Sequence, residues 1–214
     1  MCSSDLHNKA ALLYFLTNAW CPYRLVNAIT ADCGPFFDDL EIYRGWAANP
    51  DGTDTASETS RFSRGDPQPT SWNGHPMQLG TAVSGRYVLG TGLAAGTSPG
   101  ARDLDGTTTV RSVPITLADP SGVLSFRYVF AHGPSSSADS LAAYVEDSTG
   151  HRTQGWQQVG SASTVAAAWT RAAVSLDPWA GQTVHLVFQA SDGGPDSLVE
   201  AELDDIRVER RVSG

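Results

Sequence analysis

Four stretches of the chain alternate hydrophobic and polar residues with a period of two, and this pattern constrains the fold more than any other feature. Such a period places one set of side chains on one face of a half-buried β-strand. Clusters of Gly, Pro, Ser and Asp separate the stretches. Their hydrophobic members are Leu124, Phe126, Tyr128 and Phe130; Leu141, Ala143 and Val145; Ala172, Val174 and Leu176; and Val184, Leu186, Phe188 and Ala190. The sequence therefore predicts an all-β fold, a two-sheet antiparallel jelly roll or sandwich of about eight to ten strands.

Charge and hydropathy argue against two classes of protein. The 214 residues carry a formal net charge of −9, whereas a nucleic-acid-binding domain needs a basic face for the phosphates. The longest apolar run, from Ala10 to Leu16, is far shorter than the roughly 20 residues that a membrane-spanning helix needs. We therefore expect neither nucleic-acid binding nor membrane insertion.

The N-terminal part of the chain differs from the rest. Residues 1–6 resemble a translated sequencing adapter, which predicts a non-native terminus; the alternative is a disordered native one. Residues 8–20 contain no Gly or Pro and have apolar residues at helical spacing, so they predict a short helix that ends at Pro22. A signal peptide is the rival interpretation. The predicted divisions are a terminus (1–6), a helix and linker (7–34), a jelly-roll β module (35–210) and a tail (211–214).

Cys21 and Cys33 each lie beside a turn-forming residue. A disulfide between them would suit a secreted protein and would close a loop of about 13 residues, worth roughly 3 kcal/mol in the chain-entropy model. Two unpaired buried thiols are the alternative. Both interpretations stay open.

The segment from Pro50 to Gly106 is long and poor in strand signals. A segment of this kind is either functional or held by local contacts. Its carboxylates suit a calcium ion, which takes six to eight oxygen ligands, but they also suit solvated turns. The aspartates in question are Asp51, Asp54, Asp66, Asp103 and Asp105.

A change of phase near the C-terminus predicts a β-bulge. Val199, Ala201 and Leu203 share one face of a strand, whereas Ile206 and Val208 belong to the opposite phase. If both sets point inward, an extra residue must lie at Asp204–Asp205, and bulges re-aim side chains toward sites. The two neighbouring carboxylates would repel each other unless a cation or an arginine lies between them.

The motifs that could carry chemistry favour binding over catalysis. The run from Gly96 to Gly100 matches G-x-S-x-G, but Pro99 follows the serine and has no N–H for an oxyanion hole, so we interpret the run as a loop. No catalytic residue is predicted. Aromatic rings that stack on sugars make Trp72 and Trp179 candidate ligand contacts, together with His132 at a strand end; the alternative is a role in the core.

Two parts of the sequence resemble known families. The β region resembles the jelly-roll modules related to extracellular MAM domains, through Phe37–Glu41 with Gly45–Trp46, Arg61–Arg64, Trp179–Val184 and Leu203–Ile206. The N-terminal part resembles the last catalytic-domain helix of secreted bacterial zinc carboxypeptidases. The residues that carry this second resemblance are Ala11–Tyr14, Cys21–Arg24, Cys33–Gly34 and Asn49–Ala56.

The resemblance implies an extracellular, non-catalytic accessory module that binds or stabilises. Its partner would be a zinc carboxypeptidase catalytic domain; the zinc ligands of that family, a His-x-x-Glu pair and a later His, have no counterpart here. Calcium is implied at Glu41 and Asp205, with Asp39 and Asp54 as further ligands. The alternative is a carbohydrate-binding module of a secreted polysaccharide-degrading enzyme, in which Trp179, Trp72 and His132 contact a glycan; an extracellular protein is a further possible partner.

Overall fold

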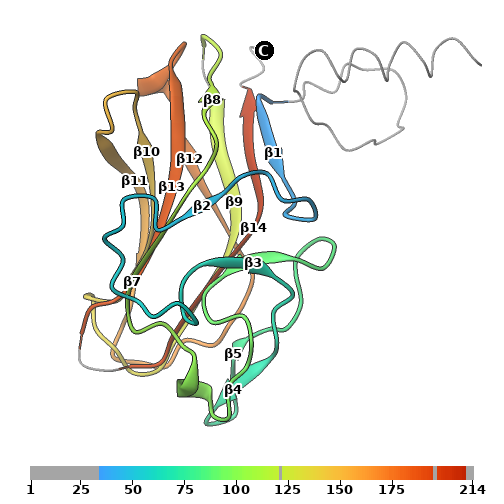
Figure 1. Ribbon diagram of the computed structural model, residues 1–214, viewed down its shortest axis with the longest axis vertical. Coiled ribbons are helices and arrows are strands. Elements are labelled where there is room, and N and C mark those ends of the chain that lie inside the picture. Colours follow the sequence, from blue (N-terminus) through green and yellow to red (C-terminus); the bar gives the residue numbers. More distant parts are fainter. Residues whose placement is uncertain (1–33, 121, 195–196, 211–214) are drawn as a thin grey trace, which may run out of the picture.

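Strands predominate in the residues that the computed structural model describes, 34–120, 122–194 and 197–210 (Figure 1). Within these ranges there are fourteen strands, two single-turn 3₁₀ helices and no α-helix. The elements are β1 (Phe36–Asp38), β2 (Ala47–Ala48), β3 (Ser63–Gly65), β4 (Thr70–Trp72), β5 (His75–Gln78), β6 (Val88–Gly90), η1 (Pro99–Ala101), β7 (Gly106–Arg111), β8 (Ile115–Thr116), β9 (Gly122–His132), β10 (Ser140–Glu146), β11 (Arg152–Val159), β12 (Thr170–Ser175), η2 (Asp177–Trp179), β13 (Thr183–Asp192) and β14 (Val199–Arg210).

The strands form two antiparallel sheets that pack face to face, which confirms the predicted all-β jelly roll. Sheet A has the order β12-β9-β14-β6-β3, and β1 also pairs with β14. Sheet B has the order β11-β10-β13-β7-β2, and β8 also pairs with β13. A separate hairpin, β4–β5, lies at the end of the sandwich opposite β8 (Figure 1).

The core lies between the two sheets and is built from the alternating stretches. The hydrophobic residues of β9, β10, β12 and β13 point inward, as their period of two predicts. Phe126 of sheet A meets Phe188 of sheet B edge to face, with ring centroids 5.0 Å apart. Burying a side chain of this size stabilises the fold by about 1.5–3 kcal/mol. These long strands hold the two outer faces at fixed positions.

The segment from Pro50 to Gly106 contains more strand than its sequence predicts. Four short strands, β3 to β6, lie within it. They escape sequence analysis because each has only three or four residues, and only β6 is buried throughout. One signal was present: Asn73 and Gly74 both have positive φ angles, as a tight hairpin turn between β4 and β5 requires.

A second hydrophobic cluster lies beneath the β4–β5 hairpin, on the outer side of sheet A. Met77 of β5 packs there with Val129 and Ala131 of β9 and with Ala167. The hairpin therefore covers part of the outer side of sheet A.

The bulge predicted in β14 is present. The register between β14 and β9 shifts between Asp204 and Arg207, and Asp205 has a φ of +49°. Leu203 and Ile206 are both fully buried, so both phases of the strand reach the core. The bulge turns Asp205 outward without moving the core residues on either side.

Several predictions fall outside the described residues. These are the terminus at 1–6, the helix at 8–20 and the Cys21–Cys33 pair, all of which precede residue 34. In the parts of the chain that the structure does describe, no helix has the length and apolar character needed to cross a bilayer.

Candidate functional site

The outer face of sheet B is polar and lies opposite the core. Since alternate residues of each strand enter the core, the residues between them point outward. The strand register arranges these outward residues in rows that cross β11, β10, β13 and β7. In order, the rows are Val159, Ser140, Ser191 and Thr107; Gln157, Ala142, Gln189 and Thr109; Gln154, Tyr144, Val187 and Arg111; and Arg152, Glu146 and His185.

Tyr144 lies near the centre of this face among three glutamine side chains. Gln154 and Gln157 are exposed, whereas Tyr144 and Gln189 are partly exposed. The amide of Gln154 donates to Oε1 of Gln157 at 3.3 Å. Among the described residues, neither the Tyr144 phenol nor the Gln189 amide has a hydrogen-bond partner. The face therefore presents an aromatic ring beside donors and acceptors that are not used within the protein.

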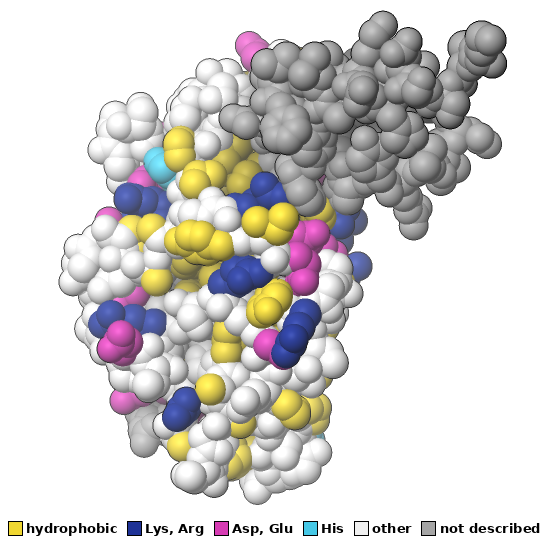
Figure 2. Space-filling model, turned by 45° about the vertical axis from the view of Figure 1, so that its right-hand side comes forward, with side chains coloured by type: hydrophobic (Ala, Val, Ile, Leu, Met, Phe, Trp, Pro, Cys, Tyr) yellow, Lys and Arg dark blue, Asp and Glu magenta, His cyan; other side chains and the backbone are white. Residues whose placement is uncertain are grey.

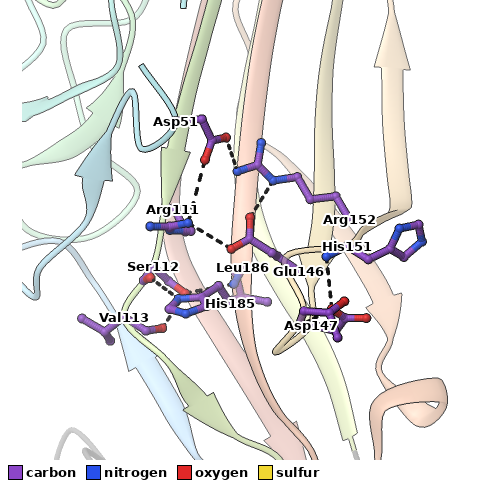
Figure 3. A network of polar contacts seen from close by, with 11 residues as sticks. Asp51, Arg111, Ser112, Val113, Glu146, Asp147, His151, Arg152, His185 and Leu186 are labelled. Atoms are coloured by element: carbon purple, nitrogen blue, oxygen red, sulfur yellow. Dashed lines mark hydrogen bonds and ion pairs between the residues drawn. The ribbon is translucent and has the colours of Figure 1, made fainter. Parts of the chain in front are cut away.

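A network of charges fixes one end of the same face (Figure 3). Glu146 of β10 accepts from Nη1 of Arg111 at 3.1 Å and from Nε of Arg152 at 2.7 Å. Arg152 also contacts Asp51 at 2.6 Å. Burial lowers the pKa of Arg152, but the hydrogen bonds with Glu146 and Asp51 outweigh this and raise it above its ordinary value. The Glu146 carboxylate is only 6% exposed, so charge-assisted hydrogen bonds hold it in place.

His185 is the register partner of Glu146 and makes a separate set of contacts with the chain that follows β7. Its Nδ1 lies 2.7 Å from the carbonyl oxygen of Ser112, and the Ser112 hydroxyl accepts from the backbone N–H of Leu186 at 2.9 Å. These contacts tie β13 to the chain that follows β7 (Figure 3). They give His185 a structural role in sheet B.

The structure does not bring the predicted ligand contacts Trp72, Trp179 and His132 to one surface. Trp72 packs on the cluster beneath the β4–β5 hairpin, whereas Trp179 packs on the main core, next to a segment (181–182) that hydrogen-bonds with the chain just after β8. His132 is 1% exposed, and its Nδ1 lies 2.6 Å from the carbonyl oxygen of Gly133. Trp46, Trp156 and Trp169 also pack on the two hydrophobic clusters, as their positions near strands predict.

All four predicted calcium ligands accept hydrogen bonds from the protein itself. Glu41 accepts from the backbone N–H groups of Arg86 and Tyr87, and Asp54 accepts from that of Thr109. Asp205 accepts from the hydroxyl of Ser84 at 2.9 Å.

The fourth, Asp39, accepts from the backbone N–H of Glu41. Glu41 and Asp205 both contact the turn at residues 84–87, whereas Asp54 lies beside β7. In the described ranges, no group of three or more His, Cys, Asp or Glu side chains is arranged to hold a metal ion. Calcium binding stays a prediction.

The outer side of β14 carries a row of buried acids that the sequence did not mark as a site. Glu200, Glu202 and Asp204 are all at most 1% exposed. Burial raises the pKa of Glu202 to about 8 and that of Asp204 to about 6, and it raises the pKa of Glu200 well above the ordinary value. Neither carboxyl oxygen of Glu202 makes a hydrogen bond of normal geometry in the described part of the chain, although the nearby Gln78 side chain acts to lower its pKa. The facing Oε1 of Gln78, on β5, lacks one too.

A pair of acidic residues, Asp139 and Asp192, lies at the end of β13, apart from the row on β14. Burial, and then the charge of Asp139, raise the pKa of Asp192 to about 7. Burial acts in the same direction on Asp139, but hydrogen bonds, first from Ser197, hold its pKa below the ordinary value. The hydroxyl of Ser197 lies within 3.3 Å of both carboxylates. Hydrogen bonds to Asp139 from Gly193, Gly194 and Ser197 hold these three residues at the start of β10.

The arginines on the face that Figure 2 presents are separated from one another by polar and hydrophobic atoms. Three of the exposed arginines are individually paired: Arg86 with Asp66, Arg171 with Glu209 and Arg207 with Asp205. Where the described residues form that face, the arginines make no continuous basic area of the kind that a phosphate backbone needs.

Comparisons with known proteins agree with the fold. A scan against protein-family models and a search of curated protein sequences found no match. Among solved structures, two cleaved adhesin domains of Lys-gingipain from Porphyromonas gingivalis have a TM-score of 0.52 with this chain. Their sequence identities are 14% and 16%; each match covers 83% of this chain, and 98% or 99% of the adhesin domain.

A CBM22-1 xylan-binding domain from Paenibacillus barcinonensis is a more distant match, with a TM-score of 0.44 and 14% identity over 87% of this chain and all of that domain. Similarity at this level of identity shows the fold alone, a two-sheet jelly roll. The reported matches give no link to a carboxypeptidase.

Proposed function

We propose that this chain is a non-catalytic extracellular module that binds a glycan across the outer face of sheet B. The observation that carries the proposal is Tyr144 in the middle of that face, surrounded by three glutamine amides with unused hydrogen-bonding capacity. An aromatic ring offers a sugar an apolar surface, and amides offer both donors and acceptors to its hydroxyls.

The fixed charges beside Tyr144 support the same function. Glu146 and Arg152 are held by three short contacts, so they lose little further freedom when a ligand arrives, and ordering costs reduce affinity. Arg152 is still 25% exposed and Arg111 31% exposed. Their remaining N–H groups can donate to sugar oxygens at the end of the face.

The comparisons agree with a binding role without establishing it. The matched Lys-gingipain domains are described as cleaved adhesin domains. A binding role outside the cell is the prediction that the sequence makes for this chain as well.

Affinity electrophoresis tests the proposal. The chain is run through native gels that contain xylan, galactan or soluble cellulose derivatives, and retardation by at least one of them is expected. The Tyr144→Ala variant is expected to lose at least tenfold in affinity for that glycan. Tyr43→Ala serves as the matched control, because Tyr43 is an aromatic residue 64% exposed and lies outside sheet B. Equal retardation of Tyr144→Ala and the parent chain would refute the proposal.

An accessory role beside a zinc carboxypeptidase stays a prediction from the sequence. The helix and the cysteine pair that suggest it precede residue 34 and lie outside the described residues. It predicts that the chain alone hydrolyses no peptide. Peptide turnover by the purified chain, lost on addition of a zinc chelator, would contradict it.

A further inference from the structure

Sheet A has a cavity on its outer side, between β12, β9 and β14. Its volume is about 210 Å³, and it is lined by Ser125, Phe126, Arg127, Arg171, Asp205, Arg207 and Glu209. The position is on the opposite side of the sandwich from Tyr144, since β9 and β14 belong to sheet A. The cavity is therefore separate from the proposed glycan face.

Two of its arginines face each other across neighbouring strands. Arg171 of β12 is the direct register partner of Arg127 of β9, and like charges directly opposite each other in a sheet are destabilising. Arg171 has a long contact with Glu209, at 3.7 Å. Arg127 is only partly exposed, and among the described residues it has no ion-pair or hydrogen-bond partner. An anion between the two guanidinium groups would remove this repulsion.

The third arginine is held by other groups. Arg207 lies 3.4 Å from Asp205 and stacks over the ring of Phe37 at 4.5 Å. The bulge in β14 is what places Asp205 in the lining, because it turns this residue outward next to Arg207. The cavity thus has a cationic side at Arg127 and Arg171 and a mixed side at Arg207, Asp205 and Glu209.

The mixed lining decides which anion fits. Sulfate has only acceptor oxygens, and phosphate near neutral pH keeps one or two hydroxyl groups but spreads up to two negative charges over a compact ion, so Asp205 and Glu209 would repel both. An acidic sugar carries one carboxylate, which matches the planar fork of an arginine, together with hydroxyl groups that donate to carboxylates. We propose that this cavity binds an acidic sugar, with the sugar carboxylate between Arg127 and Arg171 and its hydroxyls toward Asp205 and Glu209.

The assignment is tested by titrating the full chain with galacturonate at low salt, with isothermal titration calorimetry or NMR to measure binding. Galactose is the matched neutral probe, and sulfate and phosphate are the simple anions. Galacturonate is expected to bind at least tenfold more tightly than each of the other three. The affinity for trigalacturonate is then compared with that for galacturonate. A cavity that takes one sugar at the end of a chain should bind both with similar affinity, because the added sugar residues lie outside it.

Arg171→Gln and Arg127→Gln are each expected to weaken galacturonate binding at least tenfold. Arg171 is exposed, so its substitution keeps the test valid if Arg127→Gln folds poorly. Arg86→Gln is the matched control, because Arg86 is an exposed arginine paired with Asp66 elsewhere. Tyr144→Ala is expected to leave galacturonate binding unchanged, which separates this site from the glycan face.

Three outcomes would overturn the proposal. The first is no binding of galacturonate. The second is sulfate or phosphate binding as tightly as galacturonate, which would mean a plain anion site. The third is a loss of galacturonate binding in Tyr144→Ala but not in Arg171→Gln, which would move the sugar to sheet B.

Discussion

Each outer face of the sandwich carries a buried glutamate, but among the described residues only the one on sheet B has charged partners. On sheet B, Glu146 lies between Arg111 and Arg152, each within 3.1 Å of its carboxylate. On sheet A, Glu202 is fully buried and neither of its oxygens makes a hydrogen bond of normal geometry with the described residues. A buried charge stabilises a fold only when its partners replace the water it loses. The difference indicates that the ion pairs of Glu146 fix the arginine side chains on the outer face of sheet B. On sheet A, the fold is more stable when the buried carboxyl groups of β14 are protonated.

The largest expected effect comes from Glu146→Gln. This change removes the buried one of the two carboxylates that Arg111 and Arg152 share and leaves them only the more exposed Asp51, so we expect the free energy of unfolding to fall by about 3 kcal/mol. Urea denaturation at neutral pH measures it. Glu58→Gln, at an exposed position, is the control and should change stability by less than about 0.5 kcal/mol. A loss no larger than that of the control would mean that the network is only a surface contact.

The same substitution at Glu202 should have the opposite sign. Glu202→Gln removes a group whose pKa is raised to about 8 and supplies an N–H for the Gln78 oxygen. We expect an increase of about 2 kcal/mol in unfolding free energy at pH 8.5, where the native carboxyl is largely ionised. At pH 5 both side chains can donate a hydrogen bond, so the two proteins should differ little. If Glu202→Gln is less stable than the wild-type chain at both pH values, the proposed difference between the two faces is wrong.

The wild-type chain should lose stability as the pH rises from about 5 to 8. The pKa values of Asp204, Asp192 and Glu202 are raised in the folded state to about 6, 7 and 8, so the folded state binds more protons than the unfolded state in this window. Each extra bound proton lowers the unfolding free energy by about 1.4 kcal/mol per pH unit. Thermal melts across this range measure the slope, which should be shallower in Glu202→Gln. A flat or rising profile would show that other groups dominate.

Calcium should raise the melting temperature by about 3–5 °C if it binds at a tenfold excess over its dissociation constant. The predicted ligands Glu41 and Asp205 both contact the 84–87 turn, so Asp205→Asn should reduce the effect. Melts with calcium, with magnesium and with chelator make the measurement. Identical melts under all three conditions would leave these carboxylates with only their present protein partners.

The smallest effect is expected for Arg171→Gln. Its contact with Glu209 is long and exposed on both sides, so unfolding free energy should change by less than about 0.5 kcal/mol. Chemical denaturation checks this. A larger loss would mean that Arg171 stabilises the fold. Arg171→Gln could then not be used to test ligand binding in the sheet A cavity separately from folding.

The sequence predicts the frame of the molecule better than its surfaces. The alternation from Leu124 to Phe130 and from Leu141 to Val145 identified central strands, because period two is a local property of the chain. The bulge at Asp204–Asp205 was predicted for the same reason. The short strands β3 to β6 were missed, since three or four residues are too few to show a period.

The candidate sites depend on register, which a single sequence does not give. Tyr144 and Gln154 become neighbours only because β10 pairs with β11, and Arg127 meets Arg171 only because β9 pairs with β12. A signal for Tyr144 was nevertheless present, as a polar-phase residue between Ala143 and Val145. Tryptophan, the stronger aromatic signal, led instead to residues that pack on the two hydrophobic clusters.

The bulge in β14 also determines where the chain can lose a residue. Before the bulge, Leu203 lies opposite Tyr128 and Asp204 opposite Arg127; after it, Arg207 lies opposite Ser125. Removing Asp205 would place Ile206 in the one unfilled position, opposite Phe126, and would restore an uninterrupted alternation. Every buried hydrophobic side chain of the strand would keep its neighbours. The losses would be confined to the lining of the sheet A cavity and to the hydrogen bonds of Asp205 with Ser84 and Asp204. Elsewhere in β14 the same deletion would turn half of the strand inside out, so the bulge is the one point of this strand at which a single-residue deletion should leave the core in place.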